Sequence, residues 1–408
     1  MTTYFTLAWR NIWRNKRRTL ITVSAIMFAV VLSIFMQSIN RGSHEMMIDN
    51  MTRFNTGHVQ IQDYRYNDEP SLDNAFAYDE KLRSKITSAA PRIEMALPRI
   101  QTFMLAADPE VTRGTLVTGI DLEKEDRFNN IKSHKTAGRF FEEEERAAVI
   151  AEGLSDRVGL GVGDTLALVG QGRFGMSASG LFEIVGIIEH PIPDMNNQAV
   201  YLPLTTAADL LSAEGHITNL LIALESERYT EQVANKLREF LEDSELVVFT
   251  WPELIPELLE LLEFDLAGAY MMSFILYVVI AFGFLGMILT MTLERIREFG
   301  ILISVGMQRI RLAFTLFLEV LIISIIGVLG GSGVAWLILY YFYLNPIQLT
   351  GEAAEAIKDM GWQPVLPMSF APDQFYTQGI IVFFIAILIA LYPVIRVFRL
   401  NVIEASRY

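Results

Sequence analysis

Few side chains in this sequence have the types and spacing that catalysis or metal binding requires. The 408 residues contain no cysteine, which excludes disulfides, thiol catalysis and cysteine-based zinc sites. The five histidines are scattered, and HEMMI at His44 lacks the second histidine of a zinc-protease motif. The acidic run at residues 142–145 is typical of a solvated face. We therefore expect a chain that is not an enzyme and that holds no metal or cofactor of its own.

Nucleotide chemistry is not expected in this chain either. The segment GLGVGD, residues 159–164, lacks the third glycine of the dinucleotide-binding fingerprint, so it indicates a turn. No Gly-Lys dipeptide occurs, and a P-loop needs one. Any ATP hydrolysis linked to this protein must take place on another chain.

One short segment, MTLERIREFGILISVGMQRIRL at residues 291–312, combines charge, apolar side chains and glycine between two apolar runs. Its charged residues would make directional contacts, and its apolar residues would insert into a partner's groove. Gly300 would permit a bend, and Gly306 a helix end. A simple basic loop is the alternative. The residues concerned are Glu294, Arg295, Arg297, Glu298, Phe299, Gly300, Ile301, Leu302 and Gly306.

Four apolar runs are long enough to cross a membrane. A bilayer core about 30 Å thick needs roughly 20 apolar residues in a helix. The first run is too long for a signal peptide and is followed by MQSINRG, which offers no small-residue cleavage site, so we interpret it as a retained anchor. The predicted transmembrane helices are residues 20–39, 267–293, 312–344 and 379–397.

The distribution of lysine and arginine predicts the orientation. Residues 10–18 carry five positive charges and no acid, and arginines also occur in residues 294–311 and in the tail, residues 398–408. The loop at residues 345–378 has one lysine and four acids. Both termini and the segment 294–311 are therefore expected in the cytoplasm. Residues 1–19 are expected to form an amphipathic helix at the membrane surface.

A large acidic block lies between the first two runs. Residues 41–265 contain 20 Lys+Arg and 39 Asp+Glu, a net charge of −19, whereas the remaining residues contain 13 and 8, a net charge of +5; together they give the total of −14. Nucleic-acid binding needs a positive surface, so the block argues against it. We expect residues 40–266 to lie outside the cytoplasm.

Strand and helix patterns alternate through this block. HVQIQD, residues 58–63, alternates with period two, and strand–helix–strand signals occur at both ends of the block. We therefore predict an α+β domain with a second lobe inserted at about residues 101–215. GQGRFGMSASG, residues 170–180, is predicted to be a hairpin tip. TWPELIPELLELLEFD, with Thr250 and Glu253 at capping-box spacing, is predicted to continue into the second transmembrane helix.

The third apolar run contains one acid and several glycines. Glu319 must face protein or water, and we interpret it as a helix-packing residue because the other runs offer no partner for a proton relay. Small residues let another helix approach closely. The glycines are Gly327, Gly330, Gly331 and Gly333.

The segment ERIREFGILISVGM resembles the cytoplasmic coupling segment of the FtsX/MacB-type ABC transporter permeases. LAWRNIWRNKRRTLIT, VIAEGLSDRVGLGVGDTLAL, FEIVGIIE, GVLGGSG and YPVIRVFRLNVIEASR are also similar to that family, in order along the chain. Within the family, the length and GHVQIQ most resemble the LolC/LolE lipoprotein-releasing permeases. The glycine-rich hairpin without proline and the long loop at residues 345–378 depart from them.

The resemblance implies a membrane α-helical permease of four transmembrane helices, with an extracytoplasmic α+β domain of two lobes, called Porter and Sabre, between the first two helices. It implies the bacterial inner membrane as location, with the domain in the periplasm. The expected partners are a cytosolic ABC ATPase dimer, which would bind ATP and magnesium and dock on residues 294–306, a second permease subunit of the same or a paralogous chain, and membrane lipids. Lipoproteins and a periplasmic carrier are further candidate partners.

We expect the function to be mechanical transmission of cytosolic ATP hydrolysis to substrates at the outer face of the membrane, with lipoprotein release as the first hypothesis. An efflux permease for an antibiotic or peptide, working with a periplasmic adaptor, and a regulator of a periplasmic hydrolase are the alternatives. Candidate contacts with acyl chains are Met27, Val31, Ile34, Phe35, Met271, Ile275, Val278 and Val279. Candidate contacts with a carrier, by analogy with LolC, are Gly170, Arg173, Phe174 and Gly180.

Overall fold

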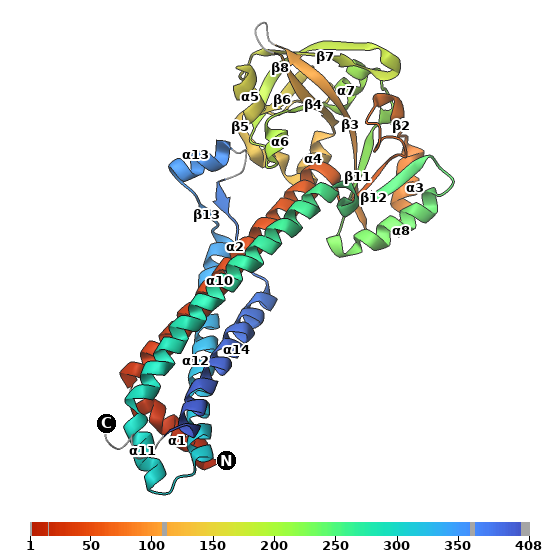
Figure 1. Ribbon diagram of the computed structural model, residues 1–408. Coiled ribbons are helices and arrows are strands. Elements are labelled where there is room, and N and C mark those ends of the chain that lie inside the picture. Colours follow the sequence, from red (N-terminus) through yellow and green to blue (C-terminus); the bar gives the residue numbers. More distant parts are fainter. Residues whose placement is uncertain (1, 15, 108–111, 360–363, 401–408) are drawn as a thin grey trace. The chain divides into compact units, whose positions relative to one another are not determined.

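A computed structural model describes residues 2–14, 16–107, 112–359 and 364–400 (Figure 1). The chain divides into two compact units. We call the first the helical unit, which consists of Met1–Glu45, Leu261–Gln348 and Val365–Tyr408. We call the second the sheet unit, which consists of Met46–Glu260 and Leu349–Pro364.

Four helices of the described chain are long and apolar enough to cross a membrane, as the sequence predicts. Two of them extend about a dozen residues past the predicted spans, because a helix does not have to end where its apolar run ends. The long helices are α2 (Lys16–Met51), α10 (Pro256–Glu294), α12 (Arg309–Leu344) and α14 (Pro372–Phe398). The shorter elements of the helical unit are α1 (Thr2–Arg14), α11 (Ile296–Ser304) and the strand pair β13 (Ile347–Gln348) and β14 (Val365–Leu366).

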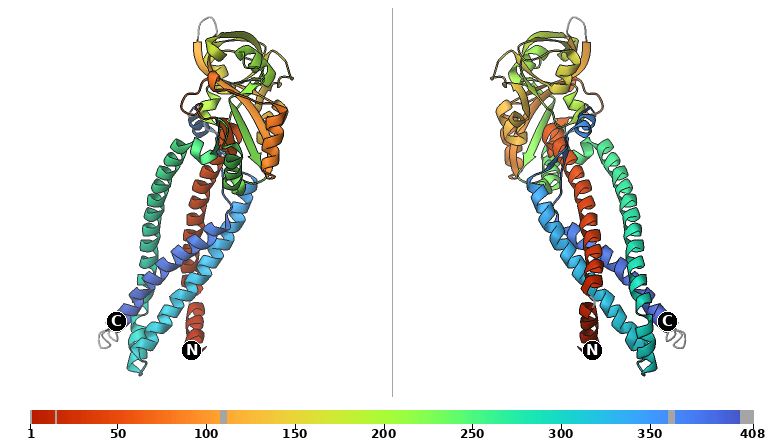
Figure 2. Two further views of the ribbon diagram at one scale, coloured as in Figure 1. Left: turned by 90° about the vertical axis from the view of Figure 1, so that its right-hand side faces the viewer. Right: turned by 90° about the vertical axis from the view of Figure 1, so that its left-hand side faces the viewer.

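Close packing holds α12 at the centre of the helical unit. Figure 2 shows α14 crossing α12, against which it packs. A Cβ atom on Gly327 would lie 2.7 Å from Ile26 of α2, and one on Gly331 would lie 2.8 Å from the Met27 carbonyl oxygen. Gly330 also faces Met27, so these three glycines let α2 approach α12. Gly333 faces open space, and the packing role predicted for it is wrong.

The sheet unit contains one sheet of ten strands and several short helices. Its strands are β1 (Val59–Asp63), β3 (Ile93–Ala107), β4 (Thr112–Ile120), β5 (Lys135–Gly138), β6 (Ala147–Ala151), β7 (Thr165–Gln171), β8 (Ser177–Ile188), β9 (Ala199–Pro203), β11 (Asn219–Leu224) and β12 (Leu246–Thr250). A separate pair is β2 (Phe76–Ala77) and β10 (His216–Ile217). The helices are α3 (Glu80–Ala89), α4 (Leu122–Asn129), α5 (Glu152–Val158), α6 (Pro193–Asn196), α7 (Leu204–Leu211), α8 (Thr230–Leu241), α9 (Trp251–Leu254) and α13 (Glu352–Asp359).

The strand order produces two lobes that share one strand. The order β12-β1-β11-β3 forms the first lobe, and β3 then pairs with β4, which continues to β9, β6 and β8. Strand β7 pairs with both β3 and β8, so the second lobe closes into a ring of strands. The predicted lobe boundary at residue 101 falls inside β3, because this strand of 15 residues pairs with β11 at its start and with β4 and β7 toward its end.

Two predicted helix starts carry the expected side-chain bonds. The backbone N–H of Leu82 donates to the Asp79 side chain at 2.7 Å at the start of α3, and Thr250 and Glu253 form the predicted capping box of α9. The sequence led us to expect one unbroken helix from here into α10, and this prediction is wrong. Helix α9 stops at Leu254, and α10 starts afresh at Pro256, a residue suited to a first helical position.

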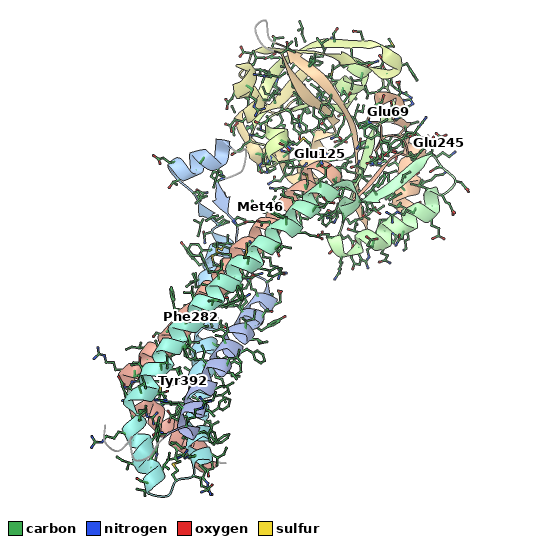
Figure 3. The ribbon with its side chains drawn as sticks, viewed as in Figure 1. Met46, Glu69, Glu125, Glu245, Phe282 and Tyr392 are labelled. Carbon is green, nitrogen blue, oxygen red and sulfur yellow. The ribbon has the colours of Figure 1, made fainter. Side chains whose placement is uncertain are left out.

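A buried ion pair fixes the start of the sheet unit to β3. The guanidinium of Arg99 donates to the Glu125 carboxylate at 2.6 and 2.8 Å, and both side chains are almost fully buried. Arg99 also donates to the Phe54 carbonyl oxygen at 2.8 Å, in the π-helical turn Thr52–Thr56 that follows α2. Glu125 is labelled in Figure 3. Because an unpaired charge here would be costly, the pair locks this turn to the sheet.

Buried histidines predict that the sheet unit loses stability in acid. Burial lowers the pKa of His190 to about 3, and its Nε2 lies 3.0 Å from the Tyr201 hydroxyl. Burial also lowers the pKa of His58 and of His134. The unfolded chain binds a proton on His190 below about pH 6.5, whereas the folded unit binds it only near pH 3. The free energy of unfolding therefore falls by about 1.4 kcal/mol per pH unit near pH 5 for His190, and His58 and His134 act in the same direction.

The measurement is the unfolding midpoint of the full chain between pH 7.5 and pH 5. We expect the midpoint to fall with the pH, and the fall to be smaller in a His190→Leu variant. A midpoint that does not change over this range would contradict the prediction.

Candidate functional site

The charged segment that the sequence singles out folds as a short helix between two long ones. The long helix α10 ends at Glu294, Arg295 interrupts the helical geometry, and α11 runs from Ile296 to Ser304. The chain then turns and enters α12 at Arg309. The segment is thus connected along the chain to one apolar helix on each side.

Glycine ends α11 in the predicted way. Gly306 has φ +103°, its N–H donates to the Ile303 carbonyl at 3.0 Å, and the N–H of Met307 donates to the Leu302 carbonyl at 3.0 Å. These two bonds form a Schellman cap, which favours glycine at this position. The predicted bend at Gly300 is absent, because α11 continues through that residue.

The apolar residues of α11 divide between two faces, and this corrects the predicted docking surface. Phe299 is 1% exposed and packs in a cluster with Leu312, Leu316 and Val397, so it is not available to a partner. Ile301 and Leu302 are exposed, and so is Val305, with 82% of its surface accessible. The sequence interpretation missed Val305, although its spacing of four residues from Ile301 on a helix was a usable signal.

Two exposed ion pairs connect this segment to the N-terminal helices. Arg14 of α1 donates to Glu298 at 2.5 Å, and Arg18 of α2 pairs with Glu294. Burial opposes ionisation of Glu298, but the hydrogen bond and charge of Arg14, with the charge of Arg295, outweigh it and hold the pKa of Glu298 below its usual value. Arg297 is exposed on the same helix. Exposed pairs of this kind orient a helix more than they stabilise it.

A third ion pair is buried and joins three helices. Arg295 donates to the Glu319 carboxylate of α12 at 2.5 Å, and the Asn11 amide of α1 donates to the same carboxylate at 2.6 Å. Glu319 is 1% exposed, so these two side chains supply its hydrogen bonds in place of water. The packing role predicted for Glu319 therefore has a specific form, in which this acid holds α1 and the start of α11 against α12.

The two predicted substrate-contact stripes differ in exposure. On α2, Ile34 is fully buried, and the other three candidates pack around the same core of the helical unit: Met27, Val31 and Phe35. They are not exposed as free contacts for an acyl chain, because apolar periodicity does not tell which side faces a neighbouring helix. On α10, Met271, Ile275 and Val279 are exposed, and Val278 is partly buried.

The predicted hairpin tip is shorter than expected, because β7 extends to Gln171 and β8 begins at Ser177. Gly170 and Gly180 therefore lie within strands, against Met104 and Phe182. Phe174 is exposed at the turn, where the Arg173 guanidinium lies 4.8 Å from its ring. The Phe174 N–H donates to Asp73 at 2.6 Å, which holds the turn against the first lobe.

Four membrane-length helices, a two-lobed domain inserted after the first of them and a charged helix between the second and third define a multi-pass membrane protein. Residues 19–240 match the model of the MacB-like periplasmic core domain, and residues 270–402 match the model of the FtsX-like permease C-terminal domain. The chain belongs to this MacB/FtsX family of ABC transporter permeases. It is a non-catalytic transmembrane subunit, and its sheet unit is a periplasmic MacB-like domain.

Solved structures of low sequence identity match the periplasmic part. The extracellular domain of the noncanonic ABC-type transporter YknZ from Gram-positive bacteria is 13% identical, with 47% of this chain and 99% of that chain covered and a TM-score of 0.34. The periplasmic region of MacB from Actinobacillus actinomycetemcomitans is 12% identical, with 52% and 96% covered and a TM-score of 0.36. No curated protein matches the chain by sequence.

Proposed function

We propose that this permease docks a cytosolic ABC ATPase dimer on α11 and uses the hydrolysis of Mg-ATP by that partner to release lipoproteins from the outer leaflet of the inner membrane. Two permease subunits, identical or paralogous, would form the complete transporter. FtsX-family permeases work with an ABC ATPase. The observation that carries the proposal is the split of α11 into a face anchored in the helical unit and a free apolar face.

The free face has the chemistry of a helix that docks in a partner's groove. Ile301, Leu302 and Val305 are exposed there, while Phe299 and Arg295 hold the opposite side of α11 to the helical unit. A docked helix transmits force only if its other side is anchored. Because α10 and α2 are continuous from the helical unit toward the periplasmic domain, a displacement of α11 would be carried along them.

The exposed apolar face of α10 supports the proposal that the substrate has acyl chains in the lipid bilayer. In the most apolar stretch of 18 residues, only 11% of α10 is buried, compared with 56% of α12. Exposed apolar side chains include Met271, Ile275, Val279 and Phe282, the last of which is labelled in Figure 3. This face would meet acyl chains of a substrate, lipid or the second subunit. The proposed acyl contact now depends on α10, because the α2 stripe is packed within the helical unit.

A second observation favours a protein partner in the periplasm. On β3, β7 and β8, four large apolar side chains are exposed on one face of the second lobe: Phe103, Leu105, Val169 and Leu181. Soluble surfaces rarely expose such a row without a partner. With the hairpin turn at Phe174, this face would suit a lipoprotein carrier. It would also suit the adaptor of an efflux system or a hydrolase under regulation.

The test is reconstitution of the permease with its ATPase in proteoliposomes that contain a triacylated lipoprotein. We expect lipoprotein to appear in the soluble fraction with a carrier protein when Mg-ATP is present, and not with a non-hydrolysable analogue. ATP hydrolysis without release, combined with export of an antibiotic or peptide, would instead establish the efflux alternative. Activation of a hydrolase without any transported substrate would establish the regulatory alternative.

A further inference from the structure

The polar face of β1 is not exposed to solvent, although its alternating sequence predicts exposure. Gln60 and Gln62 alternate with Val59 and Ile61, the pattern of a half-buried strand. In the structure Gln60 is 5% exposed and Gln62 is 2% exposed. Buried glutamines need hydrogen-bond partners, so their surroundings are informative.

Both glutamines line an open pocket of the periplasmic domain with a volume of about 190 Å³. No acidic or basic residue lines the pocket among the residues described. Its wall contains six carboxamides: Asn55, Gln60, Gln62, Asn67, Gln101 and Asn219. The remaining lining residues are Thr56, Tyr66, Pro70 and Leu254.

Two of these carboxamides are incompletely paired. Gln62 and Asn219 face each other across the antiparallel pair β1–β11. Gln60 Nε2 donates to Gln62 Oε1 at 2.9 Å, but Gln62 Nε2 and Asn219 Oδ1 are buried without a hydrogen-bond partner among the described residues. One is a donor and the other an acceptor, and they belong to opposed residues on one face of the sheet. Buried polar groups without a partner destabilise a fold unless a ligand or a water molecule forms hydrogen bonds with them.

We propose that this pocket binds a neutral carbohydrate. A sugar hydroxyl donates one hydrogen bond and accepts others, so neighbouring hydroxyls can serve the Gln62 donor and the Asn219 acceptor together. The lack of lining charges disfavours phosphates, carboxylates and amines. Pro70 and Leu254 supply apolar surface for the C–H face of a sugar ring.

The sequence positions of the lining residues connect the pocket to two of the long helices, α2 and α10. Asn55 and Thr56 belong to the π-helical turn directly after α2, and Leu254 is the last residue of α9, just before α10 begins. A bound sugar would thus contact the segments through which both helices enter the periplasmic domain. The binding proposal itself does not depend on the substrate of the transporter.

Saturation-transfer NMR with the full-length protein in nanodiscs tests the proposal, using maltotriose and N,N′,N″-triacetylchitotriose as neutral probes and trialanine amide as the peptide comparison. We expect at least one saccharide to bind and its signal to fall at least tenfold in Asn219→Leu and in the double variant Gln60→Leu/Gln62→Leu. Asn235→Leu is the matched control, because Asn235 is exposed on α8, outside the pocket. Binding should persist in this control.

Absence of a saccharide signal, or a signal that persists in Asn219→Leu, overturns the proposal, and binding of trialanine amide alone replaces the sugar with a peptide. The unfolding midpoint without ligand gives an independent readout. Leucine at position 219 removes an unpaired acceptor, so we expect the midpoint to stay constant or rise. A midpoint that falls by several degrees, together with no saccharide binding, would show that ordered water completes the pocket and would also overturn the proposal.

Discussion

A permease that carries both Ile301→Asp and Val305→Asp is expected to lose its ATPase partner. Both side chains are exposed on the free face of α11, one helical turn apart, and the opposite face packs on the helical unit. Each aspartate would place a carboxylate without a partner in an apolar interface, at a cost of several kcal/mol. We expect the affinity for the ATPase to fall by about a hundredfold or more, measured by co-purification and by titration in nanodiscs.

The matched control is Ser304→Asp, which adds a negative charge at an exposed polar position of the same helix. It should leave the affinity for the ATPase within a few-fold of the original value. Deletion of residues 294–306 should also abolish ATP-dependent activity. That deletion is a weaker test, because it removes the buried Phe299 and the Arg295 partner of Glu319. Full ATPase binding by the double aspartate variant would show that the partner docks elsewhere.

The sequence predicts the existence of α11 but not which of its faces is free. Arginine, glutamate and glycine at these spacings indicate a helix with a glycine end, and the Gly306 cap has this form. Phe299 and Ile301 are both apolar and only two residues apart, so they point to different sides of the helix. Only the packing of Leu312 and Val397 from other helices decides that Phe299 is the buried one.

The sequence also fails to predict which faces of α2 and β1 are buried, and the reason is the same. The apolar stripe at Ile34 of α2 has the composition of a lipid-facing surface. It is nevertheless packed in the helical unit, because glycines on α12, some 300 residues further along the chain, let α2 approach that helix. The alternation in β1 correctly predicts a strand with Gln60 and Gln62 on one face. Burial of that face depends on the turn after α2 and on β11, which no local pattern specifies. Local periodicity thus predicts elements, whereas distant neighbours decide their exposure.

Replacement of Arg295 by methionine is expected to destabilise the helical unit more than any change on the exposed face of α11. The substitution leaves the Glu319 carboxylate buried with only the Asn11 amide to bond it. Breaking a buried pair in this way costs about 3–5 kcal/mol. The measurement is the unfolding midpoint in detergent. Arg53→Met is the control, because the Arg53–Asp49 pair is exposed and its loss should cost no more than about 0.5 kcal/mol.

The double variant Arg295→Met/Glu319→Leu separates stability from transmission. Apolar side chains of similar size can replace a buried pair without loss of stability, so we expect the midpoint to recover most of its original value. If the Arg295–Glu319 pair transmits the movement of α11 to α12, ATP-driven activity stays low in this stable variant while the ATPase remains bound. Recovery of both the midpoint and the activity would contradict that role and would show that the pair serves folding alone.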